Sequence, residues 1–259
     1  MQNVELRTIL FELALCLTED NRHKGISEMK YSILITGANR GIGLELARVF
    51  SQNDWEVIAT CREPEVASDL KRIQATSGGR LTIRKLDVIQ DKDITVLAEE
   101  LAGKPLDILL NNAGILGPKQ QEFGRLDEAA WLETFSVNTL GPYRMARALA
   151  DNVAGSKRRI IATITSEMGS TSGTSGGYYV YRSSKAAANM IMKNLSLDLG
   201  RKGITCVSLH PGWVRTRMGG SSAPLSPAES AGGLFQVLTS LGQKQNGAFL
   251  DYKGKNISW

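Results

Sequence analysis

The stretch SILITGANRGIGLELARVF, residues 32–50, decides the fold of this 259-residue chain. Its first four residues form a short apolar run, typical of a strand buried on both faces of a parallel sheet. A turn containing Gly37, Gly41 and Gly43 follows, and Leu44 to Phe50 has helical spacing. This context suits a dinucleotide phosphate, because small residues admit the pyrophosphate and a helix N-terminus offers unpaired N–H groups. The spacing differs from the commoner Gly-x-Gly-x-x-Gly, so a purely structural turn is the alternative.

Strands and helices alternate along the rest of the chain. Short apolar runs predict further strands at residues 56–60, 81–86, 106–110, 159–164, 205–209 and 247–251. Helical patterns lie between them, including one over 91–101 and one over 127–150 that is interrupted at Gly141-Pro142. The expected fold is therefore a single-domain Rossmann-type α/β fold, a doubly wound parallel sheet with helices on both faces and right-handed crossovers.

Residues 1–29 are predicted to form an N-terminal extension, an amphipathic helix followed by a polar linker, ahead of a dinucleotide-binding domain at 30–259. Because the first core strand begins directly after Met29, this residue is an alternative start of the chain. We expect that deleting residues 1–28 leaves folding and activity largely intact. Expression of the shortened chain and measurement of its yield check this, and loss of soluble protein would contradict it.

Composition excludes several classes of protein. The formal charge is +5, yet no dense Lys/Arg run indicates a nucleic-acid site, so an anionic cofactor is the simpler reading. The longest apolar run, residues 9–17, is too short to span a bilayer and contains Glu12. The two histidines and three scattered cysteines (His23, His210, Cys16, Cys61, Cys206) argue against a metal site or a His-based hydrolase. Unpaired cysteines also favour a reducing compartment and a cytoplasmic location.

Two arginines favour NADP(H) over NAD(H) as the cofactor. Arg62 follows the second predicted strand, where NAD-selective sites tend to carry an acidic residue for the ribose 2′-hydroxyl. Arg40 lies in the glycine turn and could reach the same 2′-phosphate. The alternative is that either arginine is a solvated surface charge.

The sequence YRSSK, residues 181–185, places a phenol and an ammonium four positions apart at the start of a predicted helix. Positions i and i+4 share one helix face, so both groups can act on one substrate. A phenol has a pKa near ~10, and a neighbouring cation is expected to lower it, which would suit Tyr181 to general acid/base work. A solvated helix face is the alternative. Ser166 ends the fifth strand, the edge of a parallel sheet where ligands bind.

Taken together, the motifs resemble those of the short-chain dehydrogenase/reductase family. The resemblance rests on the glycine turn, Asp87-Val88, Asn111-Asn112-Ala113-Gly114, Asn138, Ser166, Tyr181-x-x-x-Lys185 and Pro211-Gly212, and covers residues 31–259. The segments 183–187, 210–214 and 218–220, and the ending with Gly247-Ala248-Phe249, Asp251-Tyr252 and Trp259, are similar to the C-factor-like and sniffer-like branch of carbonyl reductases.

This resemblance implies an NADPH-dependent oxidoreductase that transfers hydride between a nicotinamide cofactor and a small carbonyl or alcohol substrate. Tyr181 would be the proton donor, Ser166 would hold the carbonyl oxygen, and Lys185 would bind the ribose and tune Tyr181. Asn138 would anchor a proton-relay water. The candidate cofactor-binding residues are Gly37, Asn39, Arg40, Gly41, Ile42, Gly43, Arg62, Asp87, Val88, Asn112, Ala113, Gly114, Tyr181, Lys185, Pro211, Gly212, Val214 and Thr216.

The chain departs from the family pattern in two places. Ser166 and Tyr181 are fifteen residues apart, a little more than usual, which leaves Thr165 and Ser170 as rivals of Ser166. Arg217 stands where related sequences usually carry an acidic residue, at the start of a Gly/Ser/Pro-rich segment expected to be a mobile lid.

Two further points stay open in the sequence. A cofactor-binding signalling protein of the C-factor type, with little or no turnover, is the alternative function. The oligomeric state is also undecided, with a homodimer and a homotetramer as the alternatives to a monomer.

Overall fold

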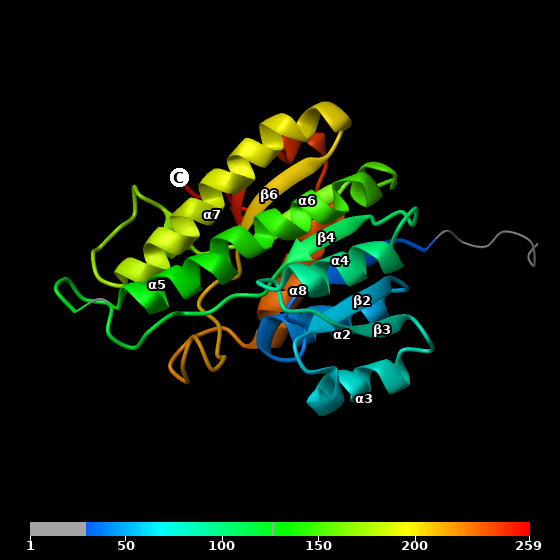
Figure 1. Cartoon of the computed structure of the whole chain (residues 1–259), viewed down its shortest axis with the longest axis horizontal. Helices are drawn as coiled ribbons and strands as arrows, with labels where there is room; N and C mark the ends of the chain where they lie inside the picture. Colours follow the sequence, from blue (N-terminus) through cyan, green and yellow to red (C-terminus); the bar gives the residue numbers. More distant parts are fainter. Residues whose placement is uncertain (1–29, 126) are drawn as a thin grey trace, which may run out of the picture. The chain divides into compact units, whose positions relative to one another are not determined.

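The computed structural model describes residues 30–125 and 127–259, and Tyr31–Trp259 form one compact unit (Figure 1). Its centre is a seven-stranded sheet in the order β3-β2-β1-β4-β5-β6-β7, and every neighbouring pair is parallel. The strands are β1 Ser32–Ile35, β2 Glu56–Cys61, β3 Leu81–Lys85, β4 Ile108–Asn111, β5 Ile160–Ile164, β6 Thr205–His210 and β7 Phe249–Asp251. The predicted parallel sheet is confirmed. The predicted extension, residues 1–29, lies outside the described residues, so its dispensability stays a prediction.

Helices cover both faces of the sheet, as the sequence predicts (Figure 1). The helices α2 Gly41–Gln52, α3 Ser68–Thr76 and α8 Pro227–Ser240 share one apolar core with alternate strand residues such as Ile33 and Ile35. The helices α4 Asp91–Glu100, α6 Gly141–Ala154 and α7 Tyr179–Asp198 share the other core with Leu34 and its equivalents. Strands that are apolar on both faces are thus buried between two helical layers.

The chain reverses its direction of travel across the sheet between β1 and β4. From β1 it moves outward through β2 and β3, then returns to form β4 on the other side of β1. Ligands bind at such a switch point, beyond the carboxyl ends of the strands. Here the two turns are joined directly, because the hydroxyl of Thr36 accepts hydrogen bonds from the N–H groups of Asn112 and Ala113, each 3.0 Å long.

The predicted interruption at Gly141-Pro142 is wrong. Helix α5, Glu128–Phe135, continues through a π-helical turn at Ser136–Leu140 into α6, which begins at Gly141. Pro142 lies in the first turn of α6, directly after the π-helical turn, so its missing N–H falls where the helical hydrogen-bond pattern changes. Gly141 has a packing role instead, since a Cβ there would lie 2.9 Å from the Val88 side chain. The irregularity falls a few residues earlier and carries Asn138, and π-turns are frequent at functional sites.

Candidate active site

The structure brings Ser166, Tyr181 and Lys185 together at the carboxyl end of β5. Tyr181 lies in the first turn of α7 and Lys185 one turn later, so Nζ of Lys185 is 5.8 Å from the centroid of the Tyr181 ring. Ser166 lies close enough to the Tyr181 phenol to lower the pKa of that phenol. All three side chains are buried, with at most 8% of any of them exposed. The residues that helical spacing pairs on α7 and the serine at the end of β5 therefore lie in one small site.

Ser166 is better placed than either of its rivals. Its Oγ accepts the N–H of Met168 at 3.1 Å and caps a short 3₁₀ turn, Glu167–Gly169. Ser170 is bonded to Ser172, Oγ to Oγ at 3.0 Å, and the Thr165 hydroxyl is buried without a partner in the described part of the chain. The turn after Ser166 packs directly on α7, because a Cβ on Gly169 would lie 2.8 Å from the backbone of Lys185.

Asn138 holds three segments of the site together. Its Oδ1 accepts the N–H of Ile115 at 2.9 Å, and its Nδ2 donates to the carbonyl oxygen of Ile115 at 2.8 Å and to Oγ of Ser184 at 3.0 Å. The π-turn is thereby fixed to the loop after β4 and to α7. Lys185 is oriented by a separate bond, from Nζ to the carbonyl oxygen of Ile164 at 2.9 Å.

The pKa of Tyr181 shifts in the direction opposite to the one expected from the sequence. Burial raises the pKa of Tyr181 to about 12, and the neighbouring Ser166 side chain opposes this only in part. Burial also lowers the pKa of Lys185 to about 8. Desolvation dominates because both groups lie inside the protein, and it penalises whichever form is charged. Tyr181 is therefore a neutral phenol at neutral pH, a group that holds its proton until a strong base forms beside it.

The lowered pKa of Lys185 predicts a pH-dependent stability. Between pH 8 and 10.5 the unfolded chain keeps a proton on Lys185 that the folded protein has lost, so the free energy of unfolding rises with pH. Lys185→Met removes this contribution. Between pH 8 and 10.5, we expect the free energy of unfolding of the wild type to rise by about 3 kcal/mol more than that of the variant. Urea unfolding of both proteins at pH 7.5 and 10.5 measures it, and an identical pH dependence in the two would contradict it.

Three glycines in the turn after β1 leave backbone without side chains at the start of α2. Helix α2 starts with no capping side chain from Arg40, and Gly37 and Gly41 have φ of 67° and 56°, a region that favours glycine. A Cβ on Gly43 would collide with Nδ2 of Asn112 and with the carbonyl oxygen of Gly37. That amide is fixed there by bonds to the carbonyl oxygens of Thr36 and Gly37, at 2.9 and 3.1 Å.

A continuous path of small residues joins the glycine turn, the cradle at the start of α2, to Lys185. A Cβ on Gly37 would lie 3.0 Å from Cα of Ala113, and one on Gly114 would lie 3.3 Å from Oδ1 of Asn138 and 3.4 Å from Nζ of Lys185. The path therefore runs from the start of α2, past the ends of β1 and β4, to the buried tyrosine and lysine. An elongated ligand with phosphates at one end and a flat reactive ring at the other, such as a nicotinamide dinucleotide, fits these residues.

The remaining predicted residues surround this path. Asp87 and Val88 follow β3, where Oδ1 of Asp87 accepts the N–H of Ile89 at 3.2 Å. Pro211 begins the loop after β6, and its carbonyl oxygen accepts the hydroxyl of Ser230 at 2.6 Å. Asn39 and Arg40 lie at the surface of the glycine turn, and Ile42 packs against the core beneath α2. Arg62 is exposed after β2. The loop after β6 contains Gly212, Val214 and Thr216.

The sequence analysis missed a role for His210. It lies at the end of β6, and its Nδ1 accepts the N–H of Glu167 at 3.2 Å, which supports the turn that follows Ser166. Burial lowers the pKa of His210, while the carboxylates of Glu167 and Asp251 oppose the shift. A neutral imidazole keeps Nδ1 available as an acceptor. Its position before Pro211, at a strand end, was the signal in the sequence.

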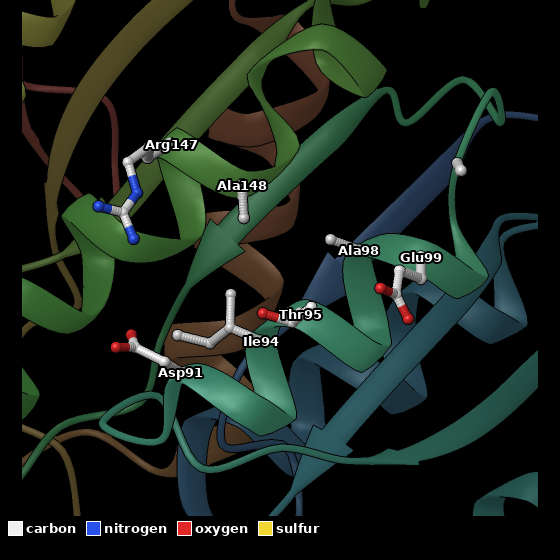
Figure 2. Close-up of a pocket in the computed structure, with 8 residues that line it drawn as sticks. Asp91, Ile94, Thr95, Ala98, Glu99, Arg147 and Ala148 are labelled. Carbon is white, nitrogen blue, oxygen red and sulfur yellow. The ribbon is translucent and has the colours of Figure 1, made fainter.

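A groove of about 360 Å³ between α4 and α6 is separate from this site (Figure 2). Figure 2 shows Asp91, Ile94 and Ala98 from α4 on the side of Arg147 and Ala148 from α6. None of the predicted catalytic or cofactor-binding residues lines it. The groove therefore does not identify the candidate active site, which is defined by the polar groups at the carboxyl edge of the sheet.

Comparisons with known proteins agree with this arrangement. A family model described as short chain dehydrogenase matches residues 31–225. C-signal of Myxococcus xanthus is 42% identical over 156 residues, which cover 60% of this chain and 93% of that protein. The carbonyl reductase Sniffer of D. melanogaster has a TM-score of 0.83 at 37% identity, covering 89% of this chain and 100% of its own.

A second solved structure, NADPH-bound carbonyl reductase from chicken fatty liver, has a TM-score of 0.81 at 34% identity and covers 89% of this chain and 99% of its own. The family match spans most of the described chain, and the parallel sheet, the glycine turn and the Tyr181–Lys185 pair agree with it. The chain therefore belongs to the short-chain dehydrogenase/reductase family, in the branch of sniffer-like carbonyl reductases and C-signal, and is an NAD(P)-dependent oxidoreductase.

Proposed function

We propose that the protein is an NADPH-dependent carbonyl reductase in which Tyr181 is the general acid/base. The observation that carries this proposal is a buried phenol beside Ser166, with the Lys185 ammonium 5.8 Å from its ring. The reaction is the transfer of hydride between the nicotinamide and a carbonyl or alcohol substrate. The relatives named above as carbonyl reductases support this reaction class.

In this mechanism the bound nicotinamide supplies hydride to the carbonyl carbon. The hydroxyls of Ser166 and Tyr181 donate hydrogen bonds to the carbonyl oxygen, and these bonds strengthen as negative charge develops on it. Tyr181 then gives its proton to that oxygen. Its pKa of about 12 keeps the proton in place until the oxygen becomes the stronger base. The nearby Lys185 ammonium stabilises the phenolate that remains, and its bond to Ile164 holds it in position.

We assign the cofactor phosphates to the glycine turn and its surroundings. The Asn112–Gly114 turn and the Pro211–Thr216 loop would hold the rest of the dinucleotide. The side chains of Arg40 and Arg62 make no hydrogen bond or ion pair within residues 30–125 and 127–259, so both guanidinium groups are available to a 2′-phosphate. Their availability supports NADP(H) over NAD(H).

A cytoplasmic location is part of the proposal. Cys61 and Cys206 are buried and form no disulfide within the described residues, which is typical of proteins in a reducing compartment. No helix in the described part of the chain is long and apolar enough to cross a membrane. A homodimer or homotetramer stays a prediction, which sedimentation analysis of the purified protein would test.

A signalling protein with little or no turnover is the second candidate, and the similarity to C-signal is the observation that favours it. The two candidates are separated by a substrate screen. We expect a panel of aldehydes, ketones and quinones to include substrates that oxidise NADPH above background, and faster than NADH. Calorimetric binding of NADPH without any oxidation across the panel would instead favour the signalling protein.

A further inference from the structure

The loop between β6 and α8 is held in a defined shape. We call residues 213–226 the lid loop. In it, the hydroxyl of Thr216 accepts a hydrogen bond from the N–H of Gly219 at 3.1 Å, and the carbonyl oxygen of Thr216 accepts one from the N–H of Gly220 at 3.0 Å. The indole N–H of Trp213 donates to the carbonyl oxygen of Gly219 at 2.8 Å. The base of the loop is closed by the bridge between Val214 and Leu225. These bonds therefore fix the backbone positions from which the side chains of the lid loop extend.

Two arginines flank Thr216, and only one of them, Arg215, forms hydrogen bonds within the lid loop. Arg215 donates from Nη1 to the carbonyl oxygens of Ala223 and Pro224, at 2.9 and 2.6 Å, and its Nη2 lies 4.0 Å from the carboxylate of Glu229. Arg217 makes no hydrogen bond or ion pair with any residue that the structure describes. A guanidinium without a protein partner is free to bind an anion.

The lid loop brings Arg217 to the glycine turn. A Cβ on Gly41 would lie 3.3 Å from Cγ2 of Thr216, so the loop and the start of α2 are in contact (Figure 1). Arg217 is the next residue after Thr216, and Arg40 precedes Gly41. The pKa of Arg40 is lowered by burial and then by the positive charges of Arg217 and Arg62, in that order. Three like charges from three segments thus lie near the glycine turn, to which the proposed function assigns the cofactor phosphates.

Resting on the proposed binding of NADPH, we propose that Arg217 binds a phosphate group of the dinucleotide together with Arg40 and Arg62, which makes the lid loop part of the cofactor site. An anion would offset the mutual repulsion of the three guanidinium groups and form charge-assisted hydrogen bonds with them. The departure from the family pattern at Arg217 then has a function. The bound phosphate would hold the lid loop against the glycine turn.

The decisive experiment measures binding and needs no turnover. NADPH, NADH and 2′-AMP are titrated calorimetrically into the wild type, Arg217→Gln and the control Arg201→Gln. Arg201 is an exposed arginine in the 3₁₀ turn before β6, at the opposite end of the strands, so its loss changes the net charge equally. We expect Arg217→Gln to weaken NADPH binding about tenfold and Arg201→Gln to leave it unchanged.

The three ligands identify the phosphate. Equal weakening of NADPH and NADH with 2′-AMP unaffected assigns Arg217 to the pyrophosphate, whereas weakening of NADPH and 2′-AMP alone assigns it to the 2′-phosphate. Both results support the proposal. Unchanged affinity of Arg217→Gln for all three ligands overturns it, and leaves the reductase proposal standing if the wild type binds NADPH. A wild type that binds no dinucleotide would overturn both proposals.

A second measurement excludes a fault in folding. Arg217→Lys keeps the charge and should recover part of the affinity, and urea unfolding should give all variants the same stability as the wild type. Saturating NADPH should slow hydrogen exchange of the amides at 218–226 in the wild type and not in Arg217→Gln. Equal protection of the loop in both proteins would contradict the link between the lid and the phosphate.

Discussion

Tyr181→Phe is expected to lower turnover by at least about 10³-fold while NADPH binding is kept. The substitution removes only the phenol oxygen beside Ser166 and leaves the buried ring in its place. Without that hydroxyl the developing alkoxide has no proton donor and loses one of its two hydrogen bonds. Single-turnover oxidation of NADPH with the best substrate of the panel measures the effect, and calorimetry measures the binding.

Tyr143→Phe is the matched control. Tyr143 lies on α6 with 42% of its surface exposed, so its hydroxyl is in contact with water, and we expect turnover close to that of the wild type. Turnover in Tyr181→Phe within a few-fold of the control would mean that another group delivers the proton. The mechanism proposed here would then be wrong, although the fold and the family would stand.

Gly43→Ala is expected to weaken NADPH binding more than about tenfold and to lower the free energy of unfolding by about 1–3 kcal/mol. The new methyl group would collide with Nδ2 of Asn112 and the carbonyl oxygen of Gly37, both of which are fixed by hydrogen bonds. The turn must therefore shift, and the cradle at the start of α2 loses its shape. NADPH titration and urea unfolding measure the two effects.

Gly232→Ala provides the control for this change. Gly232 lies inside α8, and a Cβ there would meet no atom within 4 Å. Alanine is favoured over glycine inside a helix by up to about 1 kcal/mol, so this variant should be slightly more stable and bind NADPH normally. Similar affinities in Gly43→Ala and Gly232→Ala would show that the close contact at Gly43 does not shape the cofactor site.

Most of the fold could be predicted because its signals are local. The apolar runs and the glycine turn located all seven strands within about two residues, since strands buried on both faces read as short continuous apolar segments. The error at Gly141-Pro142 has a clear origin. Sequence rules treat this pair as a helix breaker, whereas α6 uses the proline in its first turn and the glycine against Val88. A contact with a distant segment cannot be read from neighbouring residues.

Sequence by itself determined the parallel sheet and the shared helix face of Tyr181 and Lys185, because periodicity and spacing specify these features, and it predicted a site at the carboxyl edge of the sheet. Only the tertiary structure decided that Ser166 meets the phenol, that burial raises the pKa of Tyr181 and lowers that of Lys185, and that Arg217 approaches Arg40. The physical reason is that desolvation and charge interactions depend on which segments surround a group in space. Folding sets those surroundings by joining residues that are far apart in the chain.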